Sequence, residues 1–525
     1  MKSKVVENWL TNVTELTFTI PFCQLLLSKG MKVVHISSQG PMEQGKDIIA
    51  VDKRGGVHCY QLKCGNINGR VWGQIKSEID ELVELPPRHP SLSNGLTKWT
   101  AYLVTNGAIA NPMSRGICDY AESKASRGYA RLKTVVGHEL VSEFTQYYDA
   151  FLPVDVVDLQ EFLELYNQHG DCELDVAKLK LFFESYFASR GKDSRQKKAE
   201  AVRASLVLLN YILTNKLARR NHLEVIKAHI LLLASIYEFA EAQRLPESLW
   251  SATEKLAYEA LNLAFRELIE ELKSHPRNYI ETKYGVLSEV VAYKIRCTEL
   301  LGYLSAYTNY CALAGIEPHS STELESITAK LAQHCRLVGE CVVPLFINRA
   351  IALRFQGQHE ESSQELAGLL VGILSCHVGE NRGMPSPYYD IRSSLDWLLG
   401  RSEIREGFKR RSYSLRTVIL LLARYGLRDL LASHWSTISR ISQQEVIPKN
   451  AKDYLIWRFE EGDLADRFSN ATQSWAQLVA ESAQDYSGSL PGVLSKRRHF
   501  LPLLINVMPQ RLSHRLALTI LDVGR

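Results

Sequence analysis

A carboxylate, an amide and an amine lie close together near the start of the chain, in an arrangement that suits phosphodiester hydrolysis. Asp47 precedes one short apolar run, and Gln61 and Lys63 end the next. A carboxylate and an amide oxygen can both ligate Mg²⁺, a hard cation that binds few protein side chains and retains water. A lysine beside the metal can orient or help deprotonate the attacking water and can stabilise negative charge on the phosphate. The pattern therefore predicts a metal-dependent nuclease site.

The two runs that carry these residues are predicted to form a hairpin. DIIAVD and VHCYQLK are rich in strand-forming residues, and the turn residues 53–56 between them end in two glycines. Because side chains alternate along a strand, Gln61 and Lys63 point to one face and Leu62 to the other. Three polar side chains are thus expected to gather at one end of the hairpin, beside a helix that carries Glu15.

The first 150 residues are predicted to form a mixed α/β domain, with a central sheet flanked by helices. The run TELTFTIPFCQLLLSK has apolar residues at helical spacing and is followed by Gly30 as a stop signal. Pro21 inside this run is expected either to kink the helix or to delay its start. Besides the hairpin, we expect strands at 31–37, 99–105 and 131–137, a helix at 71–85, and a further helix starting near His138.

The order of these features resembles the PD-(D/E)XK nuclease superfamily, and within it the Mrr-like restriction endonucleases, which often carry Q-x-K in place of D/E-x-K. The resemblance extends over residues 10–145. Six features carry it, in the order of the chain: an acid in the first helix (Glu15), a helix end (Leu26 to Gly30), a G-x-D strand start (Gly45 with Asp47), the Q-x-K strand (Gln61 with Lys63), a V-T-x-G strand end (Val104 to Gly107) and a strand-to-helix exit (Val136 to Leu140). Residues 41–44, PMEQ, depart from the small, glycine-rich run that the family has before its aspartate.

The resemblance implies an Mg²⁺-dependent endodeoxyribonuclease, with Mn²⁺ as a substitute cofactor. Asp47 and Gln61 would ligate the metal, Lys63 would assist the water and the phosphate, and Glu15 would support the site. Foreign DNA is the implied substrate, in restriction or phage defence, and RNA stays open. Alternatively, the three hairpin residues only face water, or the domain has the fold without the activity. Glu15 is equally typical of a helix N-terminus.

Residues 151–525 are predicted to form an all-helical domain, with a solenoid-like array as one possible arrangement. The window INRAIALRFQGQHEESSQELAGLL has the small residues and the glycine of a tetratricopeptide helix pair, without a second copy at a fixed period. This domain could regulate the nuclease, grip DNA, or mediate assembly as a homo-oligomer or with a protein partner. As a rival hypothesis, it is a binding scaffold whose N-terminal domain holds nucleic acid without cutting it.

Several polar residues outside the core of the site are weaker candidates for contacts with nucleic acid. Gln74 and Lys76 either face substrate phosphate or form a solvated helix face. Lys409, Arg410 and Arg411 form a basic cluster that either grips backbone phosphates or is a solvated turn. The net charge of +4 and the pI near 8.4 are too mild to argue for nucleic acid by themselves, so local clusters must carry that argument.

Composition and motifs exclude several other classes of protein. The chain has ten cysteines but no CxxC pair and no zinc-ligand spacing, which is typical of free thiols in a reducing compartment. It has no apolar signal core and no apolar run of membrane-spanning length, so we expect a soluble, cytoplasmic protein. Neither a Walker-type phosphate loop nor a GxSxG motif is present, which argues against ATP-driven translocation and serine hydrolase chemistry.

Overall fold

The computed structural model of the chain consists of two compact units. Unit 1 comprises Met1–Leu233 and Leu245–Asn262, and unit 2 comprises Ala234–Arg244 and Leu263–Arg525. The domain boundary that the sequence predicts near residue 150 therefore lies inside unit 1, at the point where the mixed α/β part ends and a helical part begins. The structure describes residues 2–37, 45–92, 98–148, 156–274, 286–378, 383–401, 410–446, 448, 451–457, 465–468 and 473–523.

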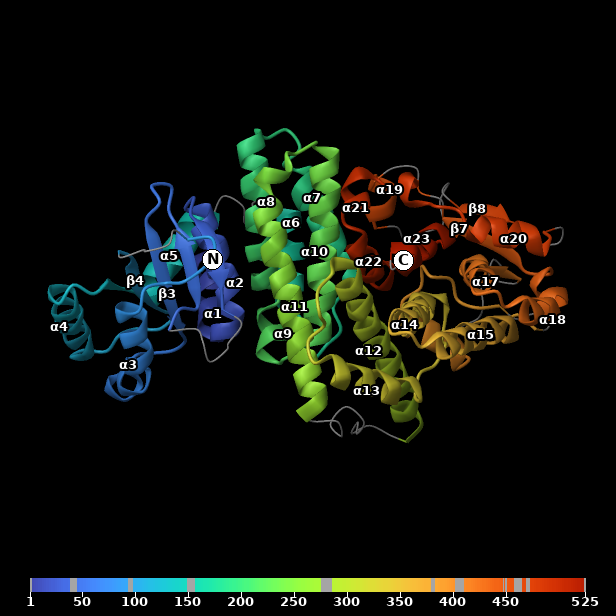
Figure 1. The fold of residues 1–525 in the computed structure, drawn as a ribbon, viewed down its shortest axis with the longest axis horizontal. Helices are drawn as coiled ribbons and strands as arrows, with labels where there is room; N and C mark the ends of the chain where they lie inside the picture. Colours follow the sequence, from blue (N-terminus) through green and yellow to red (C-terminus); the bar gives the residue numbers. More distant parts are fainter. Residues whose placement is uncertain are drawn as a thin grey trace. The chain divides into compact units, whose positions relative to one another are not determined.

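Unit 1 begins with the predicted mixture of helices and strands (Figure 1). Each predicted element of this part is present within a few residues of its expected bounds. Two helices, α1 and α4, are additional to those expected. The elements are α1 (Lys2–Asn12), α2 (Glu15–Ser28), β1 (Lys32–Ile36), β2 (Ile48–Val51), β3 (Val57–Lys63), α3 (Gly69–Glu84), β4 (Thr100–Thr105), α4 (Met113–Ser126), β5 (Arg131–Val135) and α5 (Gly137–Tyr148).

The five strands form one mixed sheet in the order β1-β2-β3-β4-β5. Strands β1 to β3 pair antiparallel, whereas β3, β4 and β5 pair parallel. A parallel pair needs a crossover connection, and helices α3 and α4 lie in the two crossovers. The turn of the β2–β3 hairpin contains Gly55 with a positive φ of 82°, as the turn glycines predict. The mixed α/β prediction is therefore confirmed.

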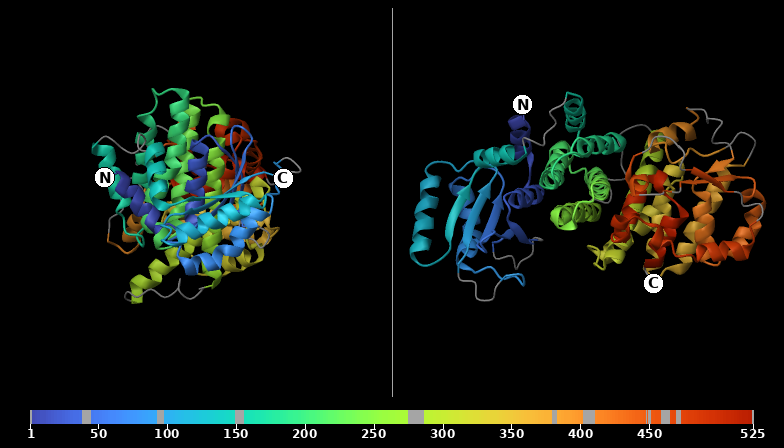
Figure 2. Two further views of the ribbon diagram at one scale, coloured as in Figure 1. Left: turned by 90° about the vertical axis from the view of Figure 1, so that its left-hand side faces the viewer. Right: turned by 90° about the horizontal axis from the view of Figure 1, so that it is seen from above.

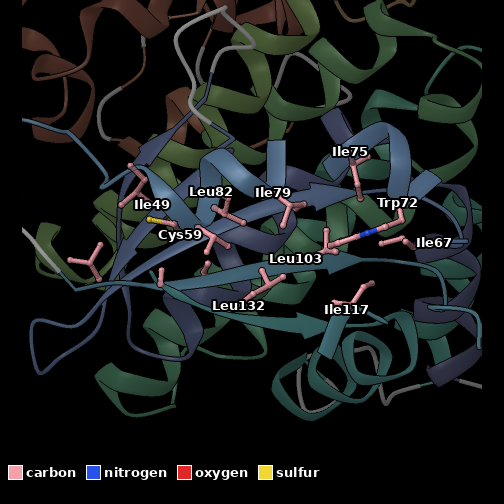
Figure 3. Packing of buried hydrophobic residues seen from close by; sticks show 14 residues of the cluster. Ile49, Cys59, Ile67, Trp72, Ile75, Ile79, Leu82, Leu103, Ile117 and Leu132 are labelled. Carbon is pink, nitrogen blue, oxygen red and sulfur yellow. The ribbon is translucent and has the colours of Figure 1, made fainter. Parts of the chain in front are cut away.

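Helices cover both faces of this sheet (Figure 2). Helices α3 and α4 bury one face through a hydrophobic cluster that includes Cys59, Ile79, Leu103 and Ile117 (Figure 3). Helix α2 packs on the other face, where the rings of Phe22 and Tyr60 lie 5.4 Å apart. Alternate residues of β3 therefore point to opposite faces of the sheet: Cys59 points towards α3 and α4, and Tyr60 points towards α2. This alternation determines the face on which each polar residue of the strand lies.

Helix α2 is stabilised at its start by a reciprocal cap. The Thr14 side chain accepts a hydrogen bond from the backbone N–H of Thr17, and the Thr17 hydroxyl oxygen accepts one from the backbone N–H of Thr14. The helix therefore begins at Glu15 and continues through Pro21, which does not delay its start. The Glu15 side chain belongs to the first helical turn, where the helix dipole favours an acid.

The remainder of unit 1 is helical and packs directly on its first helices. Trp9 of α1 is fully buried, and its ring lies 5.0 Å from that of Phe144 and 5.1 Å from that of Tyr211. Since Tyr211 belongs to α8, the sheet-bearing part and the following helices share one core. These helices are α6 (Val156–Tyr166), α7 (Val176–Ala188), α8 (Arg195–Ile212), α9 (Thr214–Ala218), α10 (His222–Ala242) and α11 (Ser251–Ser274), of which α10 and α11 also enter unit 2.

Unit 2 is mostly helical but contains a small three-stranded sheet. Its helices are α12 (Val286–Ala314), α13 (Ser321–Ala332), α14 (Val343–Phe355), α15 (His359–Cys376), α16 (Ile391–Leu398), α17 (Leu415–Arg424), α18 (Arg428–Ile438), α19 (Ala451–Leu455), α20 (Trp475–Ser482), α21 (Gly492–Ser495), α22 (Leu501–Val507) and α23 (His514–Val523). Its strands are β6 (Arg411–Ser412), β7 (Ser442–Val446) and β8 (Ala465–Phe468), in the order β6-β7-β8.

The expectation of an all-helical region after residue 150 is therefore wrong at this sheet. The central strand, β7, has the sequence SQQEV, and Gln443, Gln444 and Glu445 are all buried. A short polar strand has neither the apolar alternation nor the β-branched run by which strands are recognised in a sequence. Its burial depends on residues far away in the chain, and the local pattern does not contain that information.

The tetratricopeptide-like window spans parts of α14 and α15, which pack against each other. Gly357 in the turn between them has a positive φ of 79°, and the Ser362 hydroxyl donates to the carbonyl of Ala350 at 2.6 Å. None of the ten cysteines, all of which the structure describes, forms a disulfide. Among the described residues, no helix combines the length and the apolar character needed to cross a membrane.

Candidate active site

Asp47 lies immediately before β2 and is bound to the neighbouring strand β3 by two hydrogen bonds. Its backbone N–H donates to the carbonyl of Tyr60 at 2.9 Å, and its Oδ2 atom accepts from the backbone N–H of Leu62 at 2.6 Å. The second bond holds the carboxylate beside the residues on either side of Leu62, which are Gln61 and Lys63. The hairpin thus brings the three predicted residues together.

The segment before Asp47 is fastened to helix α3. Gly45 has a positive φ of 64°, and a Cβ atom at this position would lie 2.2 Å from the carbonyl oxygen of Glu78. Only glycine fits such an approach without displacing the backbone. The buried Lys46 donates from Nζ to the carbonyl of Glu81 at 3.2 Å, and burial lowers the pKa of Lys46 to about 8. These contacts explain the glycine of the G-x-D strand start.

Gln61 is nearly fully buried and has an unused acceptor. Strand alternation places it on the face of β3 that carries Cys59, which is the face covered by α3. Its side-chain Oε1 atom has no hydrogen-bond partner among the described residues. Since buried polar atoms nearly always have partners, this amide oxygen is an acceptor whose hydrogen-bonding capacity the described residues leave unused.

Lys63 is held between two carboxylates that come from different helices. Its Nζ atom lies 2.9 Å from Oε2 of Glu78 on α3 and 3.4 Å from Oε2 of Glu15 on α2. Burial by itself would lower the pKa of Lys63, but the hydrogen bond to Glu78 and the carboxylates of Glu15 and Asp47 outweigh it and raise the pKa. Lys63 is therefore an ammonium ion at neutral pH.

Glu78 is a site residue that the sequence analysis missed. It lies one helical turn after Gln74, which the sequence suggested as a phosphate contact, so both share one face of α3. Helical spacing would thus have grouped the two residues. No local pattern indicates which face of that helix meets the end of β3, because that depends on the crossover between β3 and β4.

The end of β3 beyond Lys63 is tied to the end of β4. The Thr105 hydroxyl donates to the carbonyl of Gly65, and the backbone N–H of Gly65 donates to Oδ1 of Asn106, both at 2.6 Å. A Cβ atom on Gly107 would lie 2.4 Å from the backbone of Gly65. The residues of the V-T-x-G strand end therefore fix the position of the end of β3 relative to β4.

The donor set fits a metal that retains most of its water. Among the described residues, no group of three or more His, Cys, Asp or Glu side chains could hold a metal ion. Asp47 and Gln61 instead offer one carboxylate and one unpaired amide oxygen, while Glu15 and Glu78 bind Lys63. Mg²⁺ is commonly bound by one or two protein ligands together with water and substrate phosphate, so these two oxygens suit it.

The weaker sequence candidates belong to different units of the structure. Gln74 and Lys76 are exposed on α3, the helix that supplies Glu78. Arg410 is exposed and Arg411 is half-buried in β6, and both belong to unit 2. The third member of that basic cluster, Lys409, lies outside the described residues, as do residues 41–44, which depart from the family pattern.

The cluster thus combines five side chains from two strand ends and two helices. Asp47 and Gln61 present oxygens, Lys63 presents a positive charge, and Glu15 and Glu78 keep that charge in place. Such a group can bind a hydrated cation and an oxyanion side by side. Comparisons of the chain with protein-family models, with curated protein sequences and with solved structures found no match.

Proposed function

We propose that the sheet-bearing part of unit 1 is a metal-dependent nuclease that hydrolyses phosphodiester bonds of DNA. The observation that carries this proposal is the position of Lys63, whose ammonium group lies between Glu15 and Glu78 on the strand that also presents Gln61. The carboxylate of Asp47 is bound to the backbone between Gln61 and Lys63. Hydrolysis of a phosphodiester needs oxygen ligands and a positive charge in this proximity.

Each residue has a distinct part in the proposed reaction. Asp47 and Gln61 would hold Mg²⁺, which when bound lowers the pKa of a water molecule and neutralises phosphate charge. Lys63, kept protonated by its two carboxylates, binds a phosphate oxygen and stabilises the charge that develops there. Glu15 and Glu78 are positioning residues that aim the ammonium group.

The choice of DNA and the role in restriction or phage defence derive from the resemblance to Mrr-like enzymes. A fold supports many functions, so this part of the proposal needs its own test. A protein that binds nucleic acid without cutting it would keep the positive charge of Lys63 but would not require a metal. Dependence on a divalent cation therefore separates the two functions.

Cleavage of supercoiled plasmid by the purified full-length protein tests the proposal. We expect cleavage with Mg²⁺ or Mn²⁺ and none with EDTA. Asp47→Asn keeps an acceptor for the backbone N–H of Leu62 but removes the charge, and we expect it to lower the rate by about 10²–10³-fold. Asp119→Asn, at an exposed position on α4, is the matched control and should cleave normally.

Two results would contradict this assignment. Metal-independent DNA binding without any cleavage would make the domain a binding module. Cleavage by Asp47→Asn at the wild-type rate would show that the reaction occurs elsewhere in the chain. A circular dichroism melt of each variant establishes that it is folded before the rates are compared.

A further inference from the structure

The tetratricopeptide-like helix pair, which the proposed nuclease function leaves unexplained, borders a pocket in unit 2. The pocket has a volume of about 550 Å³ and is bounded by α13, α14 and α15. This volume is within the range of roughly 300–1,000 Å³ that is usual for small-molecule sites. Its lining includes Ala332, Arg336, Arg349, Gln364, Glu365 and Gly368.

Arg349 on α14 is the most deeply buried charged group of this pocket. Its side chain is 7% exposed, and its Nη1 atom donates to the hydroxyl of Thr328 at 3.2 Å. Its Nε atom is buried and has no hydrogen-bond partner among the described residues. A buried donor without an acceptor lowers the stability of the folded protein by about 1–3 kcal/mol, and by more for a charged group. We therefore expect an acceptor from outside the protein to bind the guanidinium of Arg349.

The carboxylates near Arg349 do not supply this acceptor. Glu365 attracts the guanidinium electrostatically, yet burial raises the pKa of Glu365 and outweighs that attraction. Burial also lowers the pKa of Arg349, although arginine remains charged. Burial thus disfavours the charged forms of both Arg349 and Glu365, and their mutual attraction opposes this effect.

Small residues leave the pocket open beside this charge. A Cβ atom on Gly368 would meet no heavy atom within 4 Å, so a side chain at that position has room to extend. Ala329 and Ala332 of α13 face the same space. Gln364 and Glu361, one and two turns before Gly368 on the same side of α15, add polar groups that can accept hydrogen bonds from a ligand.

We propose that this pocket binds the oxyanion group of a small polar molecule, either a carboxylate or a phosphate, with Arg349 as its anchor. The guanidinium presents donors in a planar fork that matches the oxygens of both groups. The remainder of the ligand would lie along α15, where Glu361 and Gln364 accept hydrogen bonds. This inference is independent of the nuclease proposal because it concerns residues of unit 2 alone.

Thermal unfolding of the full-length protein with two simple probes tests the proposal. Inorganic phosphate and acetate are titrated to 50 mM, with sodium chloride at matched ionic strength as the reference. A ligand that binds the folded state raises Tm according to its concentration and Kd. We expect at least one probe to raise Tm more than chloride does. The probe that acts identifies a phosphorylated or a carboxylated ligand.

Variants decide whether the effect arises in this pocket. Gly368→Leu fills the open space, and Ala367→Leu adds the same side chain at the adjacent residue, which does not line the pocket. We expect Gly368→Leu and Arg349→Gln to weaken probe binding at least tenfold and Ala367→Leu to leave it unchanged. If Arg349→Gln does not fold, Gly368→Leu alone decides.

Two outcomes would overturn the proposal. In one, neither probe raises Tm of the wild-type protein beyond the chloride reference. In the other, the rise is equal in wild type, Gly368→Leu and Ala367→Leu, which would show general stabilisation by an excluded anion and no binding in the pocket.

Discussion

The Nζ atom of Lys63 lies 2.9 Å from Oε2 of Glu78, and the two side chains differ greatly in exposure. Lys63 is 15% exposed, whereas Glu78 and the second partner, Glu15, are 44% and 43% exposed. The ammonium group is thus inside the site and its carboxylates are at the rim. Ion pairs with such exposed partners contribute about 0–1 kcal/mol, so a phosphate can replace a carboxylate at little cost.

Substitutions at Gln61 and Lys63 should separate metal binding from turnover. Gln61→Glu keeps an oxygen ligand and adds charge, so we expect it to retain activity and to bind Mg²⁺ more tightly. Lys63→Ala removes the positive charge but no oxygen, so it should retain metal binding and lose about 10²–10³-fold in rate. Calorimetric titration with Mn²⁺ beside a cleavage assay measures both. Loss of metal affinity in Lys63→Ala would refute this separation of roles.

Glu78→Gln should shift the pH dependence of cleavage. The hydrogen bond to Glu78 raises the pKa of Lys63, so its loss should lower that pKa. If the protonated lysine stabilises the phosphate, cleavage activity should be lost when Lys63 loses its proton. We expect this alkaline loss of activity to occur at a lower pH in Glu78→Gln than in the wild-type protein. A rate profile that extends above pH 10.5, the ordinary pKa of lysine, measures this shift. Glu84→Gln, on the same helix but bound to Lys124, is the control, and an unshifted profile in Glu78→Gln would exclude a role for this pair.

Glu340 in unit 2 should make stability depend on pH. It is 1% exposed and accepts hydrogen bonds from the backbone of Tyr413 and the hydroxyl of Ser414. Burial nevertheless raises the pKa of Glu340 from 4.5 to about 7. Between pH 4.5 and 7 the folded state therefore binds more protons at Glu340 than the unfolded state does. The stabilisation of the folded state that results is complete below pH 4.5 and is lost as the pH rises through 7.

The loss from Glu340 amounts to about 3 kcal/mol in the free energy of unfolding at pH 8, on the order of 1.4 kcal/mol for each pKa unit. Glu340→Gln cannot titrate, so its stability should change less between pH 5 and 8 than that of wild type. Denaturant unfolding at both pH values measures the difference, with the exposed Glu317→Gln as the control. Parallel changes in all three proteins would show that another group causes the pH dependence.

The basic cluster Lys409, Arg410 and Arg411 should contribute to DNA affinity if unit 2 contacts the substrate. Replacing all three by Ala should reduce the slope of log K against log salt by about 1 for each phosphate contact that is lost. The full-length protein is needed, since a fragment ending at residue 150 would lack Tyr211, against which Trp9 packs. Equal affinities and slopes for wild type and the triple variant would instead favour a protein partner or self-association.

Local sequence patterns were sufficient to predict the elements that form the hairpin of the site. The alternation in VHCYQLK and the glycines of the turn predicted β3 and its pairing with β2. Asp47, Gln61 and Lys63 could be grouped because they are close in sequence and their positions depend on one hairpin. Glu15 could be suggested because the family that the chain resembles has an acid in its first helix, and its Oε2 atom lies 3.4 Å from Nζ of Lys63.

The sequence by itself thus determined the strands of the first 150 residues, their helices other than α1 and α4, and the three polar residues at the end of one hairpin. Only the tertiary structure showed Glu78 beside Lys63, the buried polar strand β7 and the open space beside Arg349. The physical reason is the range of the interactions. Alternation, helical spacing and turn glycines are properties of a few adjacent residues, whereas these three features depend on which distant segments pack together.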